Sequence, residues 1–378
     1  MRRSTDKILT THVGSLATDD PVVPGSDNYE VRLQQAVQTV VARQRETGLD
    51  IINEGEFTKG GDWLSFIDGR LGGFEARTAQ PDQVFITQGK DREEFAEFYR
   101  YASEKGTLFY LPNGQIATKR PLWFAVEPII YIGHAALQRE IDLLHAATGT
   151  LDVFLTSTAP ASFEPYYRNE HYASQEDFLF ALAEALSTEY KMIADAGFIL
   201  QIDDAWLPAT WDRTGIQMGL KEYHKWCQIR IEALNHALQD IPQEQIRYHL
   251  CWGSWHGPHA YDIELANIVD IMLSVNAGAY LIEAANARHE HEYIVWDGVK
   301  LPDDKILIPG VITHSTDLIE HPELVSQRIQ RFAQRLGRDN VIAGADCGFG
   351  GRSHPQIAWA KLHSLVQGAE LASRALGY

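Results

Sequence analysis

Short apolar runs rich in β-branched residues alternate along the chain with longer stretches of helical periodicity. Each short run is typical of a buried strand. These runs are residues 8–13, 50–54, 151–156, 198–203, 246–251, 279–283, 306–311 and 340–345. Apolar residues at helical spacing predict helices over 28–47, 176–196, 218–239 and 321–336. The last of these helices has Pro322 near its start, where proline is favoured.

Strands that alternate with helices predict parallel βαβ units, and we expect an α/β fold of the (β/α)8 TIM barrel type. Such a barrel needs about 250 residues, so a chain of 378 residues has room for insertions. We expect one barrel domain over 1–378, with insertions at about 60–130 and 284–304. A doubly wound open sheet is the alternative architecture. Its dinucleotide-binding form is disfavoured because no G-x-G-x-x-G follows the first predicted strand.

The net charge of the chain limits the kinds of molecule that it is expected to bind. Lys and Arg total 33 against 51 Asp and Glu, a formal net charge of −18. This excess of acid argues against binding to nucleic acid or to an anionic membrane, since both require a basic surface. No apolar run approaches the roughly 20 residues of a membrane span, and three cysteines do not make a disulfide framework. We therefore expect a cytoplasmic protein with small-molecule partners, and a homo-oligomer is left open.

Ionisable residues gather where the predicted strands end. In a TIM barrel the active site lies at the C-terminal ends of the strands. The residues at these ends are His12, Glu54, Glu56, Asp203, Asp204, His249, Cys251, Glu283, His314, Asp346 and Cys347. A purely structural fold would place apolar residues there, so the pattern predicts a reactive site.

The sharpest local motif is His249-Leu250-Cys251. Side chains alternate along a strand, so His249 and Cys251 point to the same face. With Cys347 from another strand end they make a set of one imidazole and two thiolates, a mixture that zinc favours, and Glu283 would supply a fourth, exchangeable ligand. The alternative is a buried, inert His–Cys pair. The remaining cysteine, Cys227, lies in a helical run and is expected in the core.

A site of this kind would activate a thiol. A free thiol has a pKa near 8.5, and zinc deprotonates a bound thiol at neutral pH. The thiolate then attacks an alkyl group, and the leaving atom needs a general acid, for which His314 is the candidate; its alternative role is as a neighbour of a helix N-cap. Aromatic residues near the strand ends would line a pocket for the alkyl donor, or else pack in the core: Trp63, Phe66, Trp206, Trp252 and Trp255. A basic loop would bind an anionic group, or is simply solvated: Arg288, His289 and His291.

Motifs across nearly the whole chain resemble one known family. They are THVGS (11–15), NEGEF (53–57), QIDDAWL (201–207), HLC (249–251), LIEAA (281–285), PGVITH (309–314) and GADCG (344–348). Together and in this order they resemble the C-terminal catalytic barrel of cobalamin-independent methionine synthase. CWGSWHGPH (251–259) and ANARHEHEY (285–293) resemble the single-domain branch that includes epoxyalkane:coenzyme M transferase.

The resemblance implies a role for each matched residue. It implies Zn²⁺ bound by His249, Cys251 and Cys347, with Glu283 as the exchangeable carboxylate. It implies that the amino acid part of homocysteine is held by Ser15, Glu56 and Asp203. It implies that His314 is the proton donor.

The expected function is a zinc-dependent thiol S-alkyltransferase, in which a zinc-bound thiolate attacks an alkyl donor. Methyl transfer to homocysteine or a related thiol is the leading version. Opening of an epoxide by a thiol such as coenzyme M is the alternative. A TIM-barrel metallohydrolase, in which zinc activates water, and a non-catalytic protein with structural zinc are the remaining alternatives.

Overall fold

The computed structural model describes residues 1–378 except 61–62, 81–82, 84, 109–119 and 150–151. Its main sheet has six parallel strands in the order β3-β5-β6-β7-β8-β9. The strands are β3 (Phe154–Thr158), β5 (Ile199–Asp204), β6 (Ile246–Leu250), β7 (Ala279–Ile282), β8 (Ile306–Ile312) and β9 (Gly344–Ala345). Each coincides with a predicted apolar run; Leu151, the first residue of the run 151–156, lies outside the described residues.

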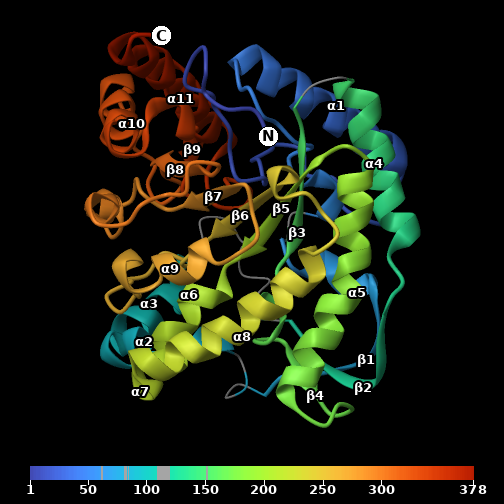
Figure 1. Cartoon of the computed structure of the whole chain (residues 1–378). Coiled ribbons are helices and arrows are strands. Elements are labelled where there is room, and N and C mark those ends of the chain that lie inside the picture. The colour runs from blue at the N-terminus through green and yellow to red at the C-terminus, as the bar shows by residue number, and fades with distance from the viewer. Residues whose placement is uncertain (61–62, 81–82, 84, 109–119, 150–151) are drawn as a thin grey trace.

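The first two predicted strands close this sheet into a ring. Thr10 forms a parallel bridge with Ala343 beside β9, and Ile52 forms one with Val153 beside β3. These two segments meet, since the Ile51 N–H donates to the Thr10 carbonyl at 3.1 Å. Eight parallel segments in a closed order are the (β/α)8 barrel that the sequence predicts (Figure 1).

Helices lie outside the ring of strands (Figure 1). They are α1 (Tyr29–Thr47), α4 (His134–Thr148), α5 (Gln175–Asp195), α8 (Leu220–Leu238), α9 (Val269–Leu273), α10 (Pro322–Leu336) and α11 (Pro355–Leu376). The four predicted helices are confirmed as α1, α5, α8 and α10, within two residues at each end. Pro322 is the first residue of α10, and His321 before it caps the helix by accepting the Glu323 N–H.

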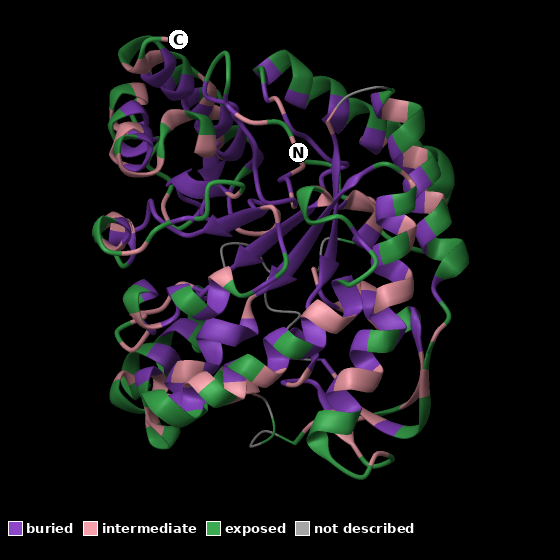
Figure 2. Ribbon diagram, viewed as in Figure 1, coloured by how far each residue is buried: buried purple, intermediate pink, exposed green. Residues whose placement is uncertain are grey.

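Two separate apolar clusters reflect the alternation of side chains along the strands. The smaller cluster fills the inside of the ring, because its members come from the barrel strands and from Val13 just beyond the first strand segment; Met1 packs at its margin. Its members are Leu9, Val13, Ile51, Phe154, Ile199, Ala279, Leu281, Ile306, Ile308 and Ile342. The larger cluster joins the outward faces of the strands to the helices. Figure 2 accordingly shows the barrel strands as buried and the helices as buried on one side only. The site therefore stands on a rigid, close-packed support.

A second, smaller sheet and several short helices lie in the segments that connect the barrel strands. A three-stranded sheet has the order β1-β2-β4, with β1 (Leu71–Arg77) antiparallel to β2 (Leu122–Tyr131) and β4 (Tyr167–Asn169) parallel to it. The short helices are α2 (Lys90–Glu94), α3 (Ala96–Lys105), α6 (Trp206–Thr210) and α7 (Ile216–Met218). The sequence pattern did not predict β1 and β2, which lie in the proposed insertion 60–130. Among the described residues, no helix has the length and apolar character that a membrane span requires.

A buried ion network ties this insertion to the barrel. Arg70, just before β1, pairs with Glu140 of α4 and Glu189 of α5, and all three side chains are almost fully buried. Glu189 also accepts from Ser157 of β3 at 2.7 Å and from Tyr131 of β2 at 2.8 Å. Burial of two carboxylates is tolerated because each has a charged or hydrogen-bonded partner.

Replacement of Arg70 tests this network. In Arg70→Met, two buried carboxylates lose their cation, and we expect a loss of about 3–5 kcal/mol in the free energy of unfolding. The measurement is urea unfolding of both proteins. Arg77→Met is the matched control, because Arg77 pairs with Glu75 and Glu170 at the surface and should change stability far less. An equal loss in both variants would contradict the assigned role of Arg70.

Candidate metal centre and active site

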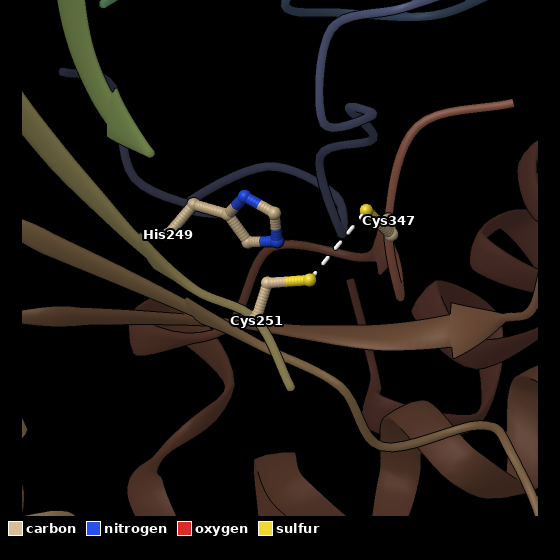
Figure 3. A group of neighbouring side chains, drawn as sticks. All are labelled: His249, Cys251 and Cys347. Atoms are coloured by element: carbon tan, nitrogen blue, oxygen red, sulfur yellow. Dashed lines mark hydrogen bonds between the residues drawn. The ribbon is translucent and has the colours of Figure 1, made fainter. Parts of the chain in front are cut away.

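Three of the predicted site residues come together at the ends of the barrel strands. His249 lies in β6, Cys251 follows β6, and Cys347 follows β9. One ligand atom from each lies within 4.8 Å of the other two, and all three side chains are buried. Cys251 Sγ and Cys347 Sγ are 3.8 Å apart and point toward each other (Figure 3). Residues almost a hundred positions apart thus form one soft-ligand cluster.

The orientation of His249 leaves one nitrogen for a ligand. Its Nδ1 lies 2.9 Å from Asp203 Oδ1, while its Nε2 is buried with no hydrogen-bond partner among the described residues. Burial lowers the pKa of His249, but the hydrogen bond and charge of Asp203 outweigh burial and raise it overall. A buried nitrogen without a partner is costly. A metal-binding histidine typically has this arrangement, with the second nitrogen held by a carboxylate.

The thiols of Cys251 and Cys347 form a hydrogen bond. The hydrogen bond between them lowers the pKa of Cys347 and raises the pKa of Cys251. Positive charge around Cys347 adds to the lowering of its pKa, and the Gly253 N–H donates to Cys251 Sγ at 3.3 Å. This environment favours one thiolate, which is the form that binds metal.

Glu283 lies next to the cluster but is not one of its three members. It follows β7, where Oε1 accepts the Trp252 N–H at 2.9 Å and Oε2 accepts from Asn286 Nδ2 at 2.8 Å. Burial raises the pKa of Glu283 to about 7. Asp346 holds the same loop by accepting the N–H groups of Ala284 and Ala285, each at 2.8 Å. Glu283 is therefore held in place through both of its oxygens.

Ser15 and Glu56 flank the cluster from the first two barrel segments. The Ser15 carbonyl accepts the Phe349 N–H at 2.8 Å, which joins Ser15 to the loop that carries Cys347. Glu56 has a left-handed backbone (φ 60°), and its Oε1 accepts from Thr156 Oγ1 at 2.9 Å. A side chain at Gly14 would place its Cβ 2.3 Å from Glu56 Oε1, so this close approach requires glycine. Burial raises the pKa of Glu56 to about 8.

Asp203 and Trp252 form hydrogen bonds within the protein, whereas the indole nitrogen of Trp206 has no hydrogen-bond partner among the described residues. Asp203 Oδ1 accepts from His249 and, at 2.7 Å, from Gln201 Nε2. Trp252 is fully buried, and its indole N–H donates to the Ile263 carbonyl at 2.7 Å. Trp206 is buried against the ring of Phe85.

His314 stands two residues beyond β8 and is buried. Its Nδ1 has no hydrogen-bond partner among the described residues. Burial lowers the pKa of His314 to about 3, so its imidazole is neutral at pH 7 and carries one N–H. The side chain lines a cavity.

This cavity, of about 540 Å³, lies beside the cluster and includes residues that the sequence patterns did not place. Asp262 sits between two of its imidazoles, 3.1 Å from His259 Nδ1 and 3.3 Å from His289 Nε2. His289 Nδ1 lies 2.7 Å from Glu292 Oε2. The sequence analysis named His289 in a candidate anion-binding loop, and His259 ends the motif 251–259, but no spacing linked either histidine with Asp262.

Replacement of His289 tests the charge interactions between His289 and its neighbours Asp262 and Glu292. Burial lowers the pKa of His289, but its carboxylate neighbours raise it to about 10 overall. A histidine whose folded pKa is above its ordinary value of 6.5 stabilises the fold fully below pH 6.5, and this contribution is lost as pH rises to about 10. We expect His289→Gln to lose about 2–4 kcal/mol at pH 6 and much less at pH 10.

The measurement is urea unfolding of both proteins at the two pH values. His236→Gln is the control, because its pair with Glu184 is exposed and should contribute little. A loss of the same size at pH 6 and pH 10 would assign the effect to packing of the ring on Trp252 instead of to its charge.

Comparison with known proteins places the chain. Residues 160–371, more than half of it, match the model of the family described as cobalamin-independent synthase, catalytic domain. A methionine synthase of Sulfolobus acidocaldarius is 23% identical over 346 residues, which are 90% of this chain and 82% of that protein. A methionine synthase of Saccharolobus solfataricus is 26% identical over 291 residues, which are 75% of this chain and 77% of that protein.

Among solved structures, a B12-independent methionine synthase from Shewanella sp. W3-18-1, in complex with selenomethionine, has the same fold. Its TM-score is 0.73 with 18% sequence identity, and the match covers 98% of this chain and 99% of that one. A putative B12-independent methionine synthase from Listeria monocytogenes matches with a TM-score of 0.65 and 18% identity, over 96% of this chain and 98% of that one. The fold, the matched domain and the clustered histidine and cysteines agree: this chain belongs to the cobalamin-independent synthase family.

Proposed function

We propose that this protein is a zinc-dependent transferase that moves a methyl group to a thiol. The observation that carries the proposal is the buried cluster of His249, Cys251 and Cys347 at the C-terminal end of the barrel, in a chain whose family includes relatives named methionine synthase. Homocysteine or a related thiol is the acceptor that these relatives suggest.

The three side chains fit zinc. Two thiols and an imidazole are the ligand types that zinc prefers. Two sulfurs bound to one tetrahedral zinc ion at about 2.3 Å lie about 3.8 Å apart, and Cys251 Sγ and Cys347 Sγ are separated by 3.8 Å. The partnerless Nε2 of His249 supplies the third ligand atom. Zinc, when bound there, lowers the pKa of a substrate thiol so that it reacts as the thiolate at neutral pH.

The residues around the cluster suit a thiol that is also an amino acid. Asp203 Oδ1 accepts from His249 and Gln201. Glu56, whose Oε1 accepts from Thr156, is the carboxylate that we propose to pair with an ammonium group. Its raised pKa reflects the cost of an unpaired buried charge. A bound ammonium would relieve that cost. Ser15, joined to the Cys347 loop, would contact the same substrate.

The reaction needs one bond made and one broken. The thiolate sulfur forms a bond to the methyl carbon, the bond from that carbon to the leaving atom breaks, and the leaving atom keeps the electron pair. The proton lost by the thiol is balanced by the proton that the leaving group gains. His314, whose imidazole is neutral at pH 7, would donate a hydrogen bond from its N–H to the leaving atom.

The direct test is product formation. Zinc-loaded protein incubated with homocysteine and a methylated folate or a methylsulfonium donor should yield the methyl thioether, detected by mass. Cys347→Ser should lose bound zinc and more than about 100-fold of the rate while the barrel stays folded. Cys227→Ser is the control, because Cys227 is also buried but lies in α8, outside the cluster, and should keep both zinc and activity.

Other outcomes would redirect the proposal. A thioether formed with an epoxide and not with any methyl donor would favour epoxide opening. Unfolding of Cys347→Ser together with loss of zinc would indicate a structural site. Full activity of metal-free protein would contradict zinc dependence.

A second test concerns Asp203 as the residue that orients His249. Asp203→Asn should weaken zinc binding by about 10–100-fold, the usual effect of losing the carboxylate behind a histidine ligand. The measurement is competition for zinc against a chromophoric chelator. Asp204→Asn is matched in charge and adjacent in β5, but Asp204 bonds Ser162 and Tyr248 instead. It should lose stability without losing zinc affinity, and equal zinc affinity in both variants would refute the orienting role.

A further inference from the structure

The cavity beside the cluster is assembled from four parts of the chain. Its lining comes from the loop after β6, from the loops after β7 and β8, and from α3 of the insertion. Its volume of about 540 Å³ is that of a site for a small organic molecule.

The cavity borders the metal centre. Glu283 and His314 line it, and so does Gly253, whose N–H donates to Cys251 Sγ at 3.3 Å. Ser15, Glu56 and Asp203, proposed above for the acceptor thiol, are not among its lining residues. A reaction between two substrates needs a second space next to the cluster, and this cavity provides it.

One wall of the cavity is apolar and firmly attached. Phe98 of α3 lines it and is 42% exposed, a high value for a phenylalanine. The helix is attached to the loop after β6 by Tyr99, whose hydroxyl accepts from Trp255 Nε1 at 3.0 Å, and Asp91 of α2 accepts the Ala260 N–H at 2.9 Å. The Phe98 ring is thus held at the cavity as a hydrophobic contact.

Arg288 supplies a positive charge to another part of the cavity lining. Arg288 lines the cavity and is exposed, and its guanidinium has no ion pair or hydrogen bond among the described residues. The two carboxylates that line the cavity are already engaged, since Asp262 lies against His259 and His289 and Glu283 accepts from Trp252 and Asn286. In a chain of net charge −18, an arginine without a carboxylate partner at a cavity points to an anionic ligand.

We propose that this cavity binds the methyl donor, and that the donor is a compact molecule with an anionic group for Arg288 and an apolar part for Phe98. The anionic group is a carboxylate or a sulfonate, either of which a guanidinium binds with paired hydrogen bonds. This inference rests on the proposed methyl transfer for the assignment of the ligand as the donor. The binding chemistry itself is independent of turnover.

The experiment measures binding without reaction. Zinc-loaded protein, with no thiol present, is titrated with hexanoate, hexane-1-sulfonate and hexylamine by calorimetry. We expect the two anions to bind and hexylamine to bind at least tenfold more weakly. Arg288→Gln should weaken hexanoate binding about tenfold. Phe98→Ala should weaken hexanoate binding severalfold but leave acetate, which has no chain to contact the ring, unchanged.

Arg100→Gln is the matched control. Arg100 lies in α3, two residues after Phe98, where it pairs with Glu104 at the surface and does not line the cavity. It removes the same charge as Arg288→Gln, so hexanoate binding should stay as in the native protein. The thermal midpoint of each variant, measured alongside, identifies any variant that has lost its fold.

The results separate this inference from the proposed function. Equal binding of hexylamine and hexanoate, or an equal effect of Arg288→Gln and Arg100→Gln, would overturn the anion site even if thioether forms. Selective binding of the anions without thioether from any methyl donor would keep the anion site and overturn its assignment to the donor. Where thioether does form, Arg288→Gln should raise KM for an anionic donor and leave kcat near its native value.

Discussion

The alternation of side chains along the barrel strands determines where Asp203 and His249, the base of the metal centre, lie. On β5, Ile199, Gln201 and Asp203 share the inward face, and the register of β5 with β6 sets Asp203 directly beside His249. Along this face of β5, the apolar Ile199 lies deep in the ring and the ionisable Asp203 lies at the C-terminal rim. A shift of one residue in either strand would turn these side chains toward the helices, so the pairing that builds the barrel also builds the site.

A chain of hydrogen bonds runs along this inward face to the metal centre. Arg247 Nε donates to Gln201 Oε1 at 2.7 Å, Gln201 Nε2 donates to Asp203 Oδ1 at 2.7 Å, and the same oxygen lies 2.9 Å from His249 Nδ1. Arg247 is fully buried, and burial lowers its pKa to about 9. Its guanidinium also lies 3.5 Å from the centre of the Phe154 ring. Buried polar groups are tolerated when each is satisfied, and here they fix the direction in which His249 presents its free nitrogen.

The sequence predicted the strands and helices in which apolar residues recur at a regular spacing, and it missed most of the segments that lack such a spacing. The barrel strands and four helices follow from runs of apolar residues, and His249, Cys251 and Cys347 were found because they end such runs. The donor cavity is built from loops and from α3. Arg288 was named from the sequence as part of a candidate anion-binding loop, but no alternation links it with Phe98 and Asp262, so their proximity is a tertiary contact. Asp203 was expected at the substrate from the resemblance. The pairing with His249 is a tertiary contact that a strand pattern does not encode.

The electrostatics of the site connect metal binding with stability. Burial raises the pKa of Glu56 to about 8 and that of Glu283 to about 7, because the cost of burying an ionised carboxylate outweighs the opposing charges of Lys59 at Glu56 and His289 at Glu283. A divalent ion at the cluster would favour the ionised form of Glu283 and the thiolates together. An ammonium beside Glu56 would do the same on the acceptor side. Since a ligand that binds only the folded state stabilises it, the groups that make this end of the barrel reactive also make its stability depend on what is bound there.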